Sequence, residues 1–259
     1  MNTIELQVEA TFSDQEYGHQ GRDLRINPRM FEKYANPRAS SDWRQFAAKL
    51  MGPLNEKKVL DYGCGMGEES VYFAKLGATV SSIDVSPVGI QLTRQRAALA
   101  GVTSSVDAAV MDATQTTFPD NTFDIVHGLG ILHHVGLSAG LAEIYRVLKP
   151  GGSGIFLEPL GNVRWVEACK GWLHQRLKGS LTLIPVNDQE ENLRYRDIVN
   201  SARVFATSEI YPYRLLYRIR KLIAPQFLYG ALQTADYALL KIAPFLRAFA
   251  GACVIRVRK

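Results

Sequence analysis

The chain has few cysteines and no long apolar run, and both features limit the classes of protein to which it can belong. Its three cysteines are odd in number and form no C-x-x-C pair, which argues against a disulfide framework and against a zinc site. This cysteine usage is typical of a reducing compartment, so we expect a cytoplasmic protein. The first residues lack a secretory signal pattern, and no uncharged run is long enough to span a bilayer.

Acidic residues are almost absent from the last fifth of the chain. Residues 211–259 contain nine Lys and Arg but one acid, a net charge of +8 in a chain whose total is +5. From 214 to 223 the cations alternate with apolar residues, which predicts a basic amphipathic helix. Such a helix suits a weak contact with an anionic membrane or a phosphate-bearing partner, or it is a solvated face. No nucleic-acid-binding pattern accompanies it, so we expect no nucleic-acid partner.

The most informative motif is VLDYGCGMGEES, residues 59–70. An apolar run ends at Asp61, and a loop with three alternating glycines leads into a helical pattern. The loop glycines are Gly63, Gly65 and Gly67. A strand that enters a glycine-rich turn before a helix is how α/β folds hold a nucleotide-like cofactor.

The details of this loop favour one cofactor over another. The sixth position of a G-x-G-x-x-G dinucleotide motif is Glu68 here, not glycine. Asp61 would repel a pyrophosphate, but it suits the cationic sulfonium and ammonium groups of S-adenosylmethionine. The loop therefore predicts a methyl-donor site, lined by the backbone of Cys64, although a structural turn is the alternative.

Asp84 ends the next apolar alternation, at 78–86, and lies 21 positions after Gly63. A ribose-binding acid is expected roughly 20 residues after the loop, and a carboxylate can accept hydrogen bonds from both ribose hydroxyls. The alternative is an acid at a strand end that caps the next helix, which Ser86 and Pro87 begin.

Asp112 occupies the corresponding place after the strand expected within 105–114. Its carboxylate can accept a hydrogen bond from the adenine amine, while the backbone N–H of Ala113 can donate to a ring nitrogen. The alternative is an ordinary turn residue.

Two later segments complete a family pattern. FDIVHGLGILHHV, at 123–135, is typical of a buried strand and a loop, and RVLKPGG, at 146–152, of a helix end before another strand. With DYGCGMG, Asp84 and Asp112, they resemble the class I S-adenosylmethionine-dependent methyltransferases, in the branch that acts on small molecules. The resemblance covers residues 40–160 well and the closing strand at 253–259 more weakly.

The resemblance implies an α/β fold with a doubly wound, mostly parallel, seven-stranded, Rossmann-like sheet whose last strand is antiparallel. Alternating helices and strands from 40 to 159 independently favour a parallel sheet. We expect residues 1–39 to form an N-terminal helical cap over the cofactor, with a helix at 28–35, and residues 40–259 to form the methyltransferase domain. The family also implies S-adenosylmethionine contacts at Val85 and Gly128.

Residues 160–203 interrupt the alternation and are expected to form a helical substrate lid after the fifth strand. A wider stretch, to residue 223, is expected to be mobile and to carry the acceptor pocket. Its apolar and aromatic residues are Trp165, Trp172, Leu173, Tyr211 and Tyr213. The alternative is that these helices only complete the fold and that their aromatic residues lie in the core.

His133 and His134 follow the fourth expected strand, where the family's loop faces the transferring methyl group. A histidine near neutral pKa suits a base that takes a proton from a hydroxyl acceptor. We therefore expect O-methylation of a small molecule, with N- or C-methylation of a small molecule or lipid as the alternative; the histidines could instead orient the loop. Further candidates for acceptor contacts are Tyr17, His19, Glu158 and Trp165. No acidic cluster for a metal can be assembled.

Two other classes remain open at this point. A nicotinamide-dependent oxidoreductase would use a similar sheet, but Glu68 argues against it. A non-catalytic, methyltransferase-like partner subunit would keep the fold without turnover. The intact glycine loop and the three acids speak against the second alternative.

Overall fold

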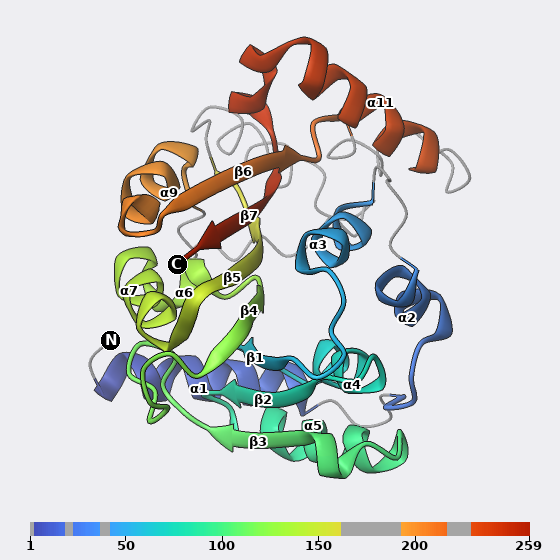
Figure 1. The fold of residues 1–259 in the computed structure, drawn as a ribbon, viewed down its shortest axis with the longest axis vertical. Coiled ribbons are helices and arrows are strands. Elements are labelled where there is room, and N and C mark those ends of the chain that lie inside the picture. Colours follow the sequence, from blue (N-terminus) through green and yellow to red (C-terminus); the bar gives the residue numbers. More distant parts are fainter. Residues whose placement is uncertain (1–2, 19–22, 37–41, 162–192, 217–228) are drawn as a thin grey trace, which may run out of the picture.

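A computed structural model describes residues 3–18, 23–36, 42–161, 193–216 and 229–259. Seven strands form one sheet in the order β3-β2-β1-β4-β5-β7-β6, with helices on both faces (Figure 1). The strands are β1 Lys58–Tyr62, β2 Thr79–Asp84, β3 Val106–Val110, β4 Phe123–Leu129, β5 Leu148–Pro159, β6 Thr207–Tyr213 and β7 Ala252–Arg258.

The sheet is parallel from β3 to β5, and β7 runs antiparallel to both of its neighbours, β5 and β6. This arrangement confirms the predicted doubly wound α/β fold with an antiparallel last strand. Strands β1 and β4 pair with one another, and β2 lies on the other side of β1. The strand order therefore reverses between β1 and β4. Ligands of open α/β sheets bind at such a reversal, beyond the carboxyl ends of the strands.

The α-helices are α1 Thr3–Tyr17, α2 Pro28–Ala35, α3 Trp43–Met51, α4 Glu68–Lys75, α5 Pro87–Leu99, α6 Leu132–Val135, α7 Leu137–Val147, α9 Tyr195–Ser201 and α11 Tyr229–Ile242. Within the described residues, short 3₁₀ helices accompany them at η1 Thr103–Ser105, η2 Ala202–Val204 and η5 Pro244–Phe249. None of the helices in the described ranges combines the length and the apolar character that crossing a membrane requires.

Helices cover both faces of the sheet, so its central strands are buried on both sides. In β1, Val59 belongs to one apolar cluster, and Leu60 and Tyr62 belong to the other. Because successive side chains of a strand point to opposite faces, one strand supplies both halves of the core. The near-continuous apolar sequence of β1 follows from this two-sided burial.

Helix α2 forms where the sequence predicts it, but it does not cover the pocket at the strand ends. Asn27 caps it by accepting hydrogen bonds from the N–H groups of Arg29 and Met30. Its buried Tyr34 packs against the rings of Tyr72 and Phe73 on α4, at centroid distances of 5.5 and 5.6 Å. The expectation that this helix caps the cofactor is wrong, because its apolar face is used against α4.

The described part of the expected lid completes the core instead. Ile198 of α9 is fully buried in the same cluster as Leu193 and Ala202. Residues 207–213 form the edge strand β6, whose Tyr211 contacts Phe46 at 4.8 Å between ring centroids. The alternative of core burial is therefore correct for this part. Trp165, Trp172 and Leu173 lie outside the described residues.

Candidate active site

The glycine loop joins β1 to α4 in a conformation that requires its glycines. Gly63, Gly65 and Gly67 all have positive φ, at +73°, +53° and +71°. Such angles are open to glycine and strained for other residues. The N–H groups of Gly63 and Cys64 both donate to the carbonyl of Ile83 at 2.9 Å, which fixes the loop to the end of β2.

Gly67 offers a direct test of this packing. A Cβ at position 67 would lie 2.5–2.8 Å from the side chain of Thr93, whereas a Cβ at Gly52, with φ +72°, would meet nothing within 4 Å. We expect Gly67→Ala to lower the free energy of unfolding by about 1–3 kcal/mol more than Gly52→Ala, because only the former adds overpacking to backbone strain. Urea denaturation measures both, and equal losses would contradict the contact.

Asp84 is held at the end of β2 by two backbone donors. Its Oδ2 accepts from the N–H of Gly65 at 2.8 Å, and its Oδ1 accepts from the N–H of Ser86 at 2.9 Å. Burial raises the pKa of the carboxyl in spite of these hydrogen bonds. The helix cap itself is Ser86, whose Oγ accepts from Gly89 N–H at 2.9 Å. Asp84 is therefore fixed at the end of β2 by backbone donors, while Ser86 caps α5 Pro87–Leu99.

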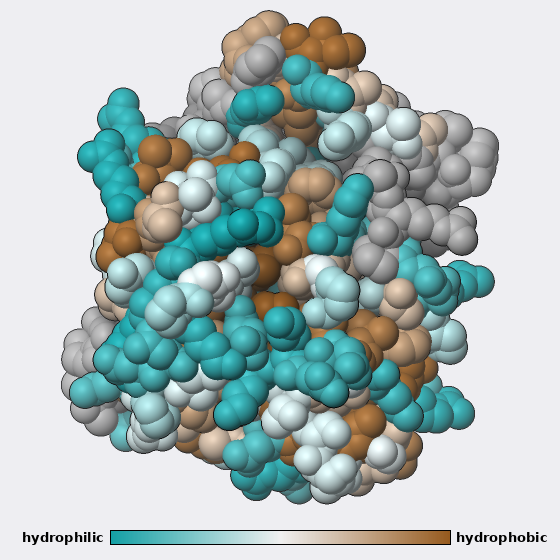
Figure 2. Space-filling model, viewed as in Figure 1, coloured by the Kyte–Doolittle hydropathy of each residue, from teal (hydrophilic) through white to brown (hydrophobic). Residues whose placement is uncertain are grey.

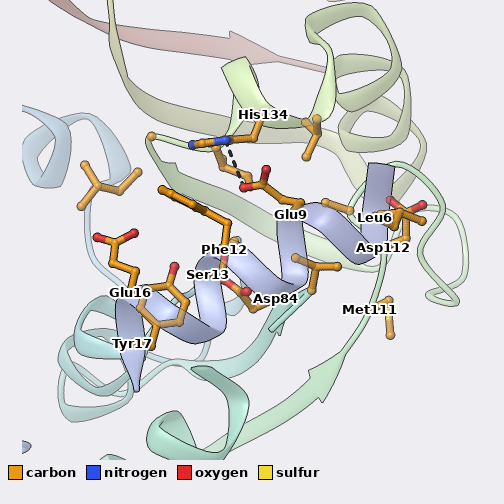
Figure 3. A pocket seen from close by; sticks show the side chains of 17 residues that line it. Leu6, Glu9, Phe12, Ser13, Glu16, Tyr17, Asp84, Met111, Asp112 and His134 are labelled. Atoms are coloured by element: carbon orange, nitrogen blue, oxygen red, sulfur yellow. Dashed lines mark ion pairs between the residues drawn. The ribbon is translucent and has the colours of Figure 1, made fainter. Parts of the chain in front are cut away.

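A pocket of about 120 Å³ lies where the strand order reverses, beyond the ends of β1, β2, β3 and β4 (Figure 3). Five of the predicted cofactor residues line it: Gly63, Asp84, Val85, Asp112 and Ala113. The predicted residues Tyr17 and His134 line it too. The structure thus brings together the loop, the two strand-end acids and one of the two histidines.

Helix α1 covers this pocket; it lies within residues 1–39, the segment expected to form a cap, although a helix was predicted there only at 28–35. Its residues Leu6, Glu9, Phe12, Ser13 and Glu16 line the pocket. Figure 3 shows them along the helix that crosses the pocket. The apolar residues of this segment occur at every second position from 4 to 12, which is a strand period and not a helix period. The pattern therefore did not predict the helix over Thr3–Tyr17.

Two side chains hold α1 against the cofactor loop and α5. Asp14 accepts hydrogen bonds from the hydroxyl of Ser86 and, at 3.2 Å, from the N–H of Val88. Tyr17 packs so closely that a Cβ at Gly65 would lie 3.2 Å from its hydroxyl and one at Gly89 3.1 Å from its ring. Burial raises the pKa of Tyr17, so the phenol stays neutral.

The other predicted cofactor residues lie beneath or beside the pocket and are not among its lining residues. Asp61 is buried, with its Oδ2 2.5 Å from the hydroxyl of Ser70 and its Oδ1 3.4 Å from Nδ1 of His127. The Sγ of Cys64 lies 3.7 Å from the hydroxyl of Thr93, and burial raises the pKa of this thiol well above its usual value. A thiol in this state is unreactive.

Two further predicted cofactor residues, Gly128 and Asp112, make close local contacts. A Cβ at Gly128 would come within 2.8 Å of Ile131 and Phe156, so this glycine allows close packing at the end of β4. Asp112 accepts from the N–H and the hydroxyl of Thr114 at 2.7 and 2.8 Å through Oδ1. Asp112 is therefore both a turn residue and part of the pocket lining.

The two histidines have different surroundings. His133 is held by Glu158, with 2.8 Å between Nδ1 and Oε2, and it does not line the pocket. His134 lines the pocket, and its Nδ1 lies 3.1 Å from Oε1 of Glu9 on α1 (Figure 3). Its imidazole ring lies 4.1 Å from that of His133. The hydrogen bond from His134 is the main cause that lowers the pKa of Glu9. The geometry therefore singles out His134 as the histidine that can reach a ligand.

Glu158 supports the loop after β4 from inside the core. It is fully buried, and its Oε1 accepts from the N–H groups of Ile131 and Leu132 at 2.9 Å each. With His133 it therefore satisfies three donors at the start of α6. The expectation that Glu158 contacts the acceptor is wrong, because its carboxylate is used by this loop. The remaining candidates, His19 and Trp165, lie outside the described residues.

The sheet topology and this pocket define a Rossmann-like, cofactor-binding protein. A methyltransferase-domain family model matches residues 59–152. The ubiquinone/menaquinone biosynthesis C-methyltransferase UbiE of Hydrogenovibrio crunogenus is 37% identical over 120 residues, 45% of this chain and 47% of that protein. The UbiE enzyme of Cereibacter sphaeroides is 32% identical over 175 residues, which cover 65% of this chain and 68% of that protein.

The chain belongs to the class I S-adenosylmethionine-dependent methyltransferase family. The chain is similar in structure to geranyl diphosphate C-methyltransferase from Streptomyces coelicolor A3(2), with a TM-score of 0.60. The match covers 99% of this chain and 98% of that enzyme's chain. At 13% identity this likeness shows the fold alone. The chain spans about half the length of several curated relatives that it matches, 47% and 51% in two of them.

Proposed function

We propose that the protein transfers a methyl group from S-adenosylmethionine to a carbon atom of an apolar small molecule. The observation that carries this proposal is the convergence of Gly63, Asp84 and Asp112 on one pocket at the reversal of strand order. The family uses this cofactor, and the relatives matched by sequence are named as C-methyltransferases. Carbon is therefore favoured over the hydroxyl acceptor that the histidines suggested.

The residues around the pocket fit the proposed cofactor. Asp84, oriented by Gly65 and Ser86, is placed to accept hydrogen bonds from ribose hydroxyls, and Asp112 lines the adjacent wall. The positive φ of Gly63 keeps the loop backbone close to the ligand. When bound, S-adenosylmethionine supplies a methyl group that is already activated by its sulfonium.

Helix α1 must move for the cofactor to enter, so α1 is the part of residues 1–39 that acts as the cap. The pocket beneath it, about 120 Å³, is smaller than the roughly 300–1,000 Å³ of ordinary ligand sites. The contacts of Asp14, Tyr17 and Glu9 are those that break when the helix moves away. We infer that the structure corresponds to the closed form of this cap.

Several of the side chains that line the pocket are apolar. Leu6, Phe12, Met111, Leu129 and Ile131 all line the pocket. Another sequence relative, from Gibberella zeae, is named a sterol 24-C-methyltransferase and is 34% identical over 109 residues, 41% of this chain and 29% of that protein. An apolar acceptor fits both observations, because burial of apolar surface would hold it beside the donor.

His134 is the group proposed to manage the proton. When a carbon acceptor gains a methyl group, a carbon–carbon bond forms, the sulfur keeps the electron pair of the broken bond, and the acceptor loses a proton. The imidazole of His134, oriented by Glu9, faces the pocket and can accept that proton. Alignment of donor and acceptor supplies the rest, on the order of 7–11 kcal/mol.

Replacing Asp84 tests the cofactor site. We expect Asp84→Ala to weaken binding of S-adenosylmethionine and S-adenosylhomocysteine by about tenfold or more, because charge-assisted hydrogen bonds are lost. Calorimetry measures this loss, and Asp107→Ala, which removes an exposed acid from β3, is the matched control. Unchanged affinity of Asp84→Ala would remove this residue from the site, and tight binding of NADH by the wild type would overturn the cofactor assignment.

Transfer of a labelled methyl group tests the reaction itself. The purified chain is incubated with ¹³C-methyl donor and a set of quinol, phenol and sterol acceptors, and the product is examined by NMR. A methyl group bonded to carbon supports the proposal, whereas a methyl ether would restore the oxygen acceptor. Cofactor binding without transfer to any acceptor would instead favour a non-catalytic partner subunit.

A further inference from the structure

The end of the molecule formed by α11 and η5 has an unusual surface. Its large apolar side chains are exposed: Tyr237, Leu239, Ile242, Phe245 and Phe249. Ile242 is 81% exposed and Phe245 74% exposed, among the highest values for large apolar residues of the described chain. Figure 2 shows hydrophobic side chains gathered at the top of the molecule, over α11, whereas α1 lies toward the other end in Figure 1.

Helix α11 buries Leu240 on its inner side, yet it also carries apolar side chains on its exposed side. Its buried positions include Asp236, whose carboxylate accepts a hydrogen bond from the N–H of Leu216. Its exposed positions include Tyr237, Ala238 and Ile242, on the side turned away from β6. Apolar groups on the exposed side of a helix are not explained by packing on the protein's own core, and such a patch is typical of an interaction site.

The exposed charges within residues 229–259 are of one sign. Lys241 and Arg247 are exposed, and the only acid within 229–259 is the buried Asp236. Exposed apolar side chains next to cations, without exposed acids, match the chemistry of an anionic bilayer surface.

We propose that α11 and η5 dock this protein on the surface of an anionic lipid membrane. Ile242 and Phe245 enter the boundary between headgroups and acyl chains, and Lys241 and Arg247 contact lipid phosphates. A second copy of the chain is a poorer partner for this face, because a two-fold contact would bring like charges together. The proposal stands on this surface alone and does not depend on which acceptor is methylated.

Vesicle sedimentation of the full chain tests the proposal. We expect binding to vesicles of phosphatidylcholine mixed with phosphatidylglycerol at low salt, and little binding to phosphatidylcholine alone or at high salt. Ile242→Glu with Phe245→Glu should reduce binding about tenfold or more, since both apolar anchors become anionic. Lys241→Gln with Arg247→Gln should remove the preference for anionic lipid.

Leu99→Glu is the matched control, because Leu99 is 66% exposed on α5 and lies outside the patch. It should bind vesicles as the wild type does, and thermal melts establish that each variant is folded. Absence of wild-type binding, or an equal loss in Leu99→Glu, would overturn the proposal. So would a wild-type dimer in analytical ultracentrifugation that Ile242→Glu with Phe245→Glu converts to monomer without any vesicle binding. Calorimetry with S-adenosylhomocysteine, expected to be unchanged throughout, separates this outcome from a failure of the cofactor site.

Discussion

Replacing His134 by alanine should lower turnover on the order of 10²-fold, with little change in the affinity for S-adenosylmethionine. His134 lines the pocket, and its imidazole is held by Glu9, so its loss removes a proton acceptor without opening the glycine loop. Single-turnover kinetics with a labelled donor measure the methyl-transfer rate, and calorimetry measures the donor affinity.

His133→Ala is the informative comparison for this prediction. His133 lies 4.1 Å from the neighbouring ring but is bound to Glu158 and is not among the pocket-lining residues. We therefore expect it to affect stability more than the methyl-transfer rate. A loss of donor affinity alone in His134→Ala would make this residue structural, and a rate that is independent of pH across neutrality would leave alignment as the whole mechanism.

Replacing Glu158 by alanine should lower the free energy of unfolding by about 3–5 kcal/mol. The side chain is fully buried, and its removal would leave the N–H groups of Ile131 and Leu132 and the ring of His133 without their acceptor. Buried donors without a partner are costly, and the lost side chain also leaves a cavity. Urea denaturation followed by circular dichroism measures the change.

Glu158→Gln is the matched variant, because it keeps the volume and one carbonyl acceptor for the same loop. It should lose clearly less stability than the alanine variant and should retain part of the methyl-transfer rate. A change of less than about 1 kcal/mol in Glu158→Ala would contradict the role assigned to this carboxylate, since that is within the net value of a single hydrogen bond.

The central fold could be predicted because its signals are local in sequence. The alternation of apolar residues at 78–86 corresponds to β2 Thr79–Asp84. The glycine loop and the end of α7 lie where turn and cap residues predict them. Asp84 could be placed at a strand end for the same reason. Its hydrogen bond from Gly65 was not foreseen, but it follows from two parallel strands that end at the same edge.

The features that sequence reasoning missed depend on distant contacts. Asp61 turns toward His127, a residue 66 positions later on the neighbouring strand. Glu158 is used by a loop 25 to 27 positions earlier in the chain. The aromatic residues at 211 and 213 were placed in a lid because nothing in their own segment shows that β7 pairs with it. A pattern confined to one segment cannot report such pairings.

The position of β7 also has a consequence for how the chain folds. β6 pairs with β7, and β7 lies between β6 and β5, although β6 precedes β7 in the sequence. During synthesis β6 therefore cannot pair with β7 until residues 252–258 have been made and can insert beside β5. The β3-to-β5 region can form a parallel sheet earlier, so folding is expected to proceed in two stages, the second limited by this late insertion.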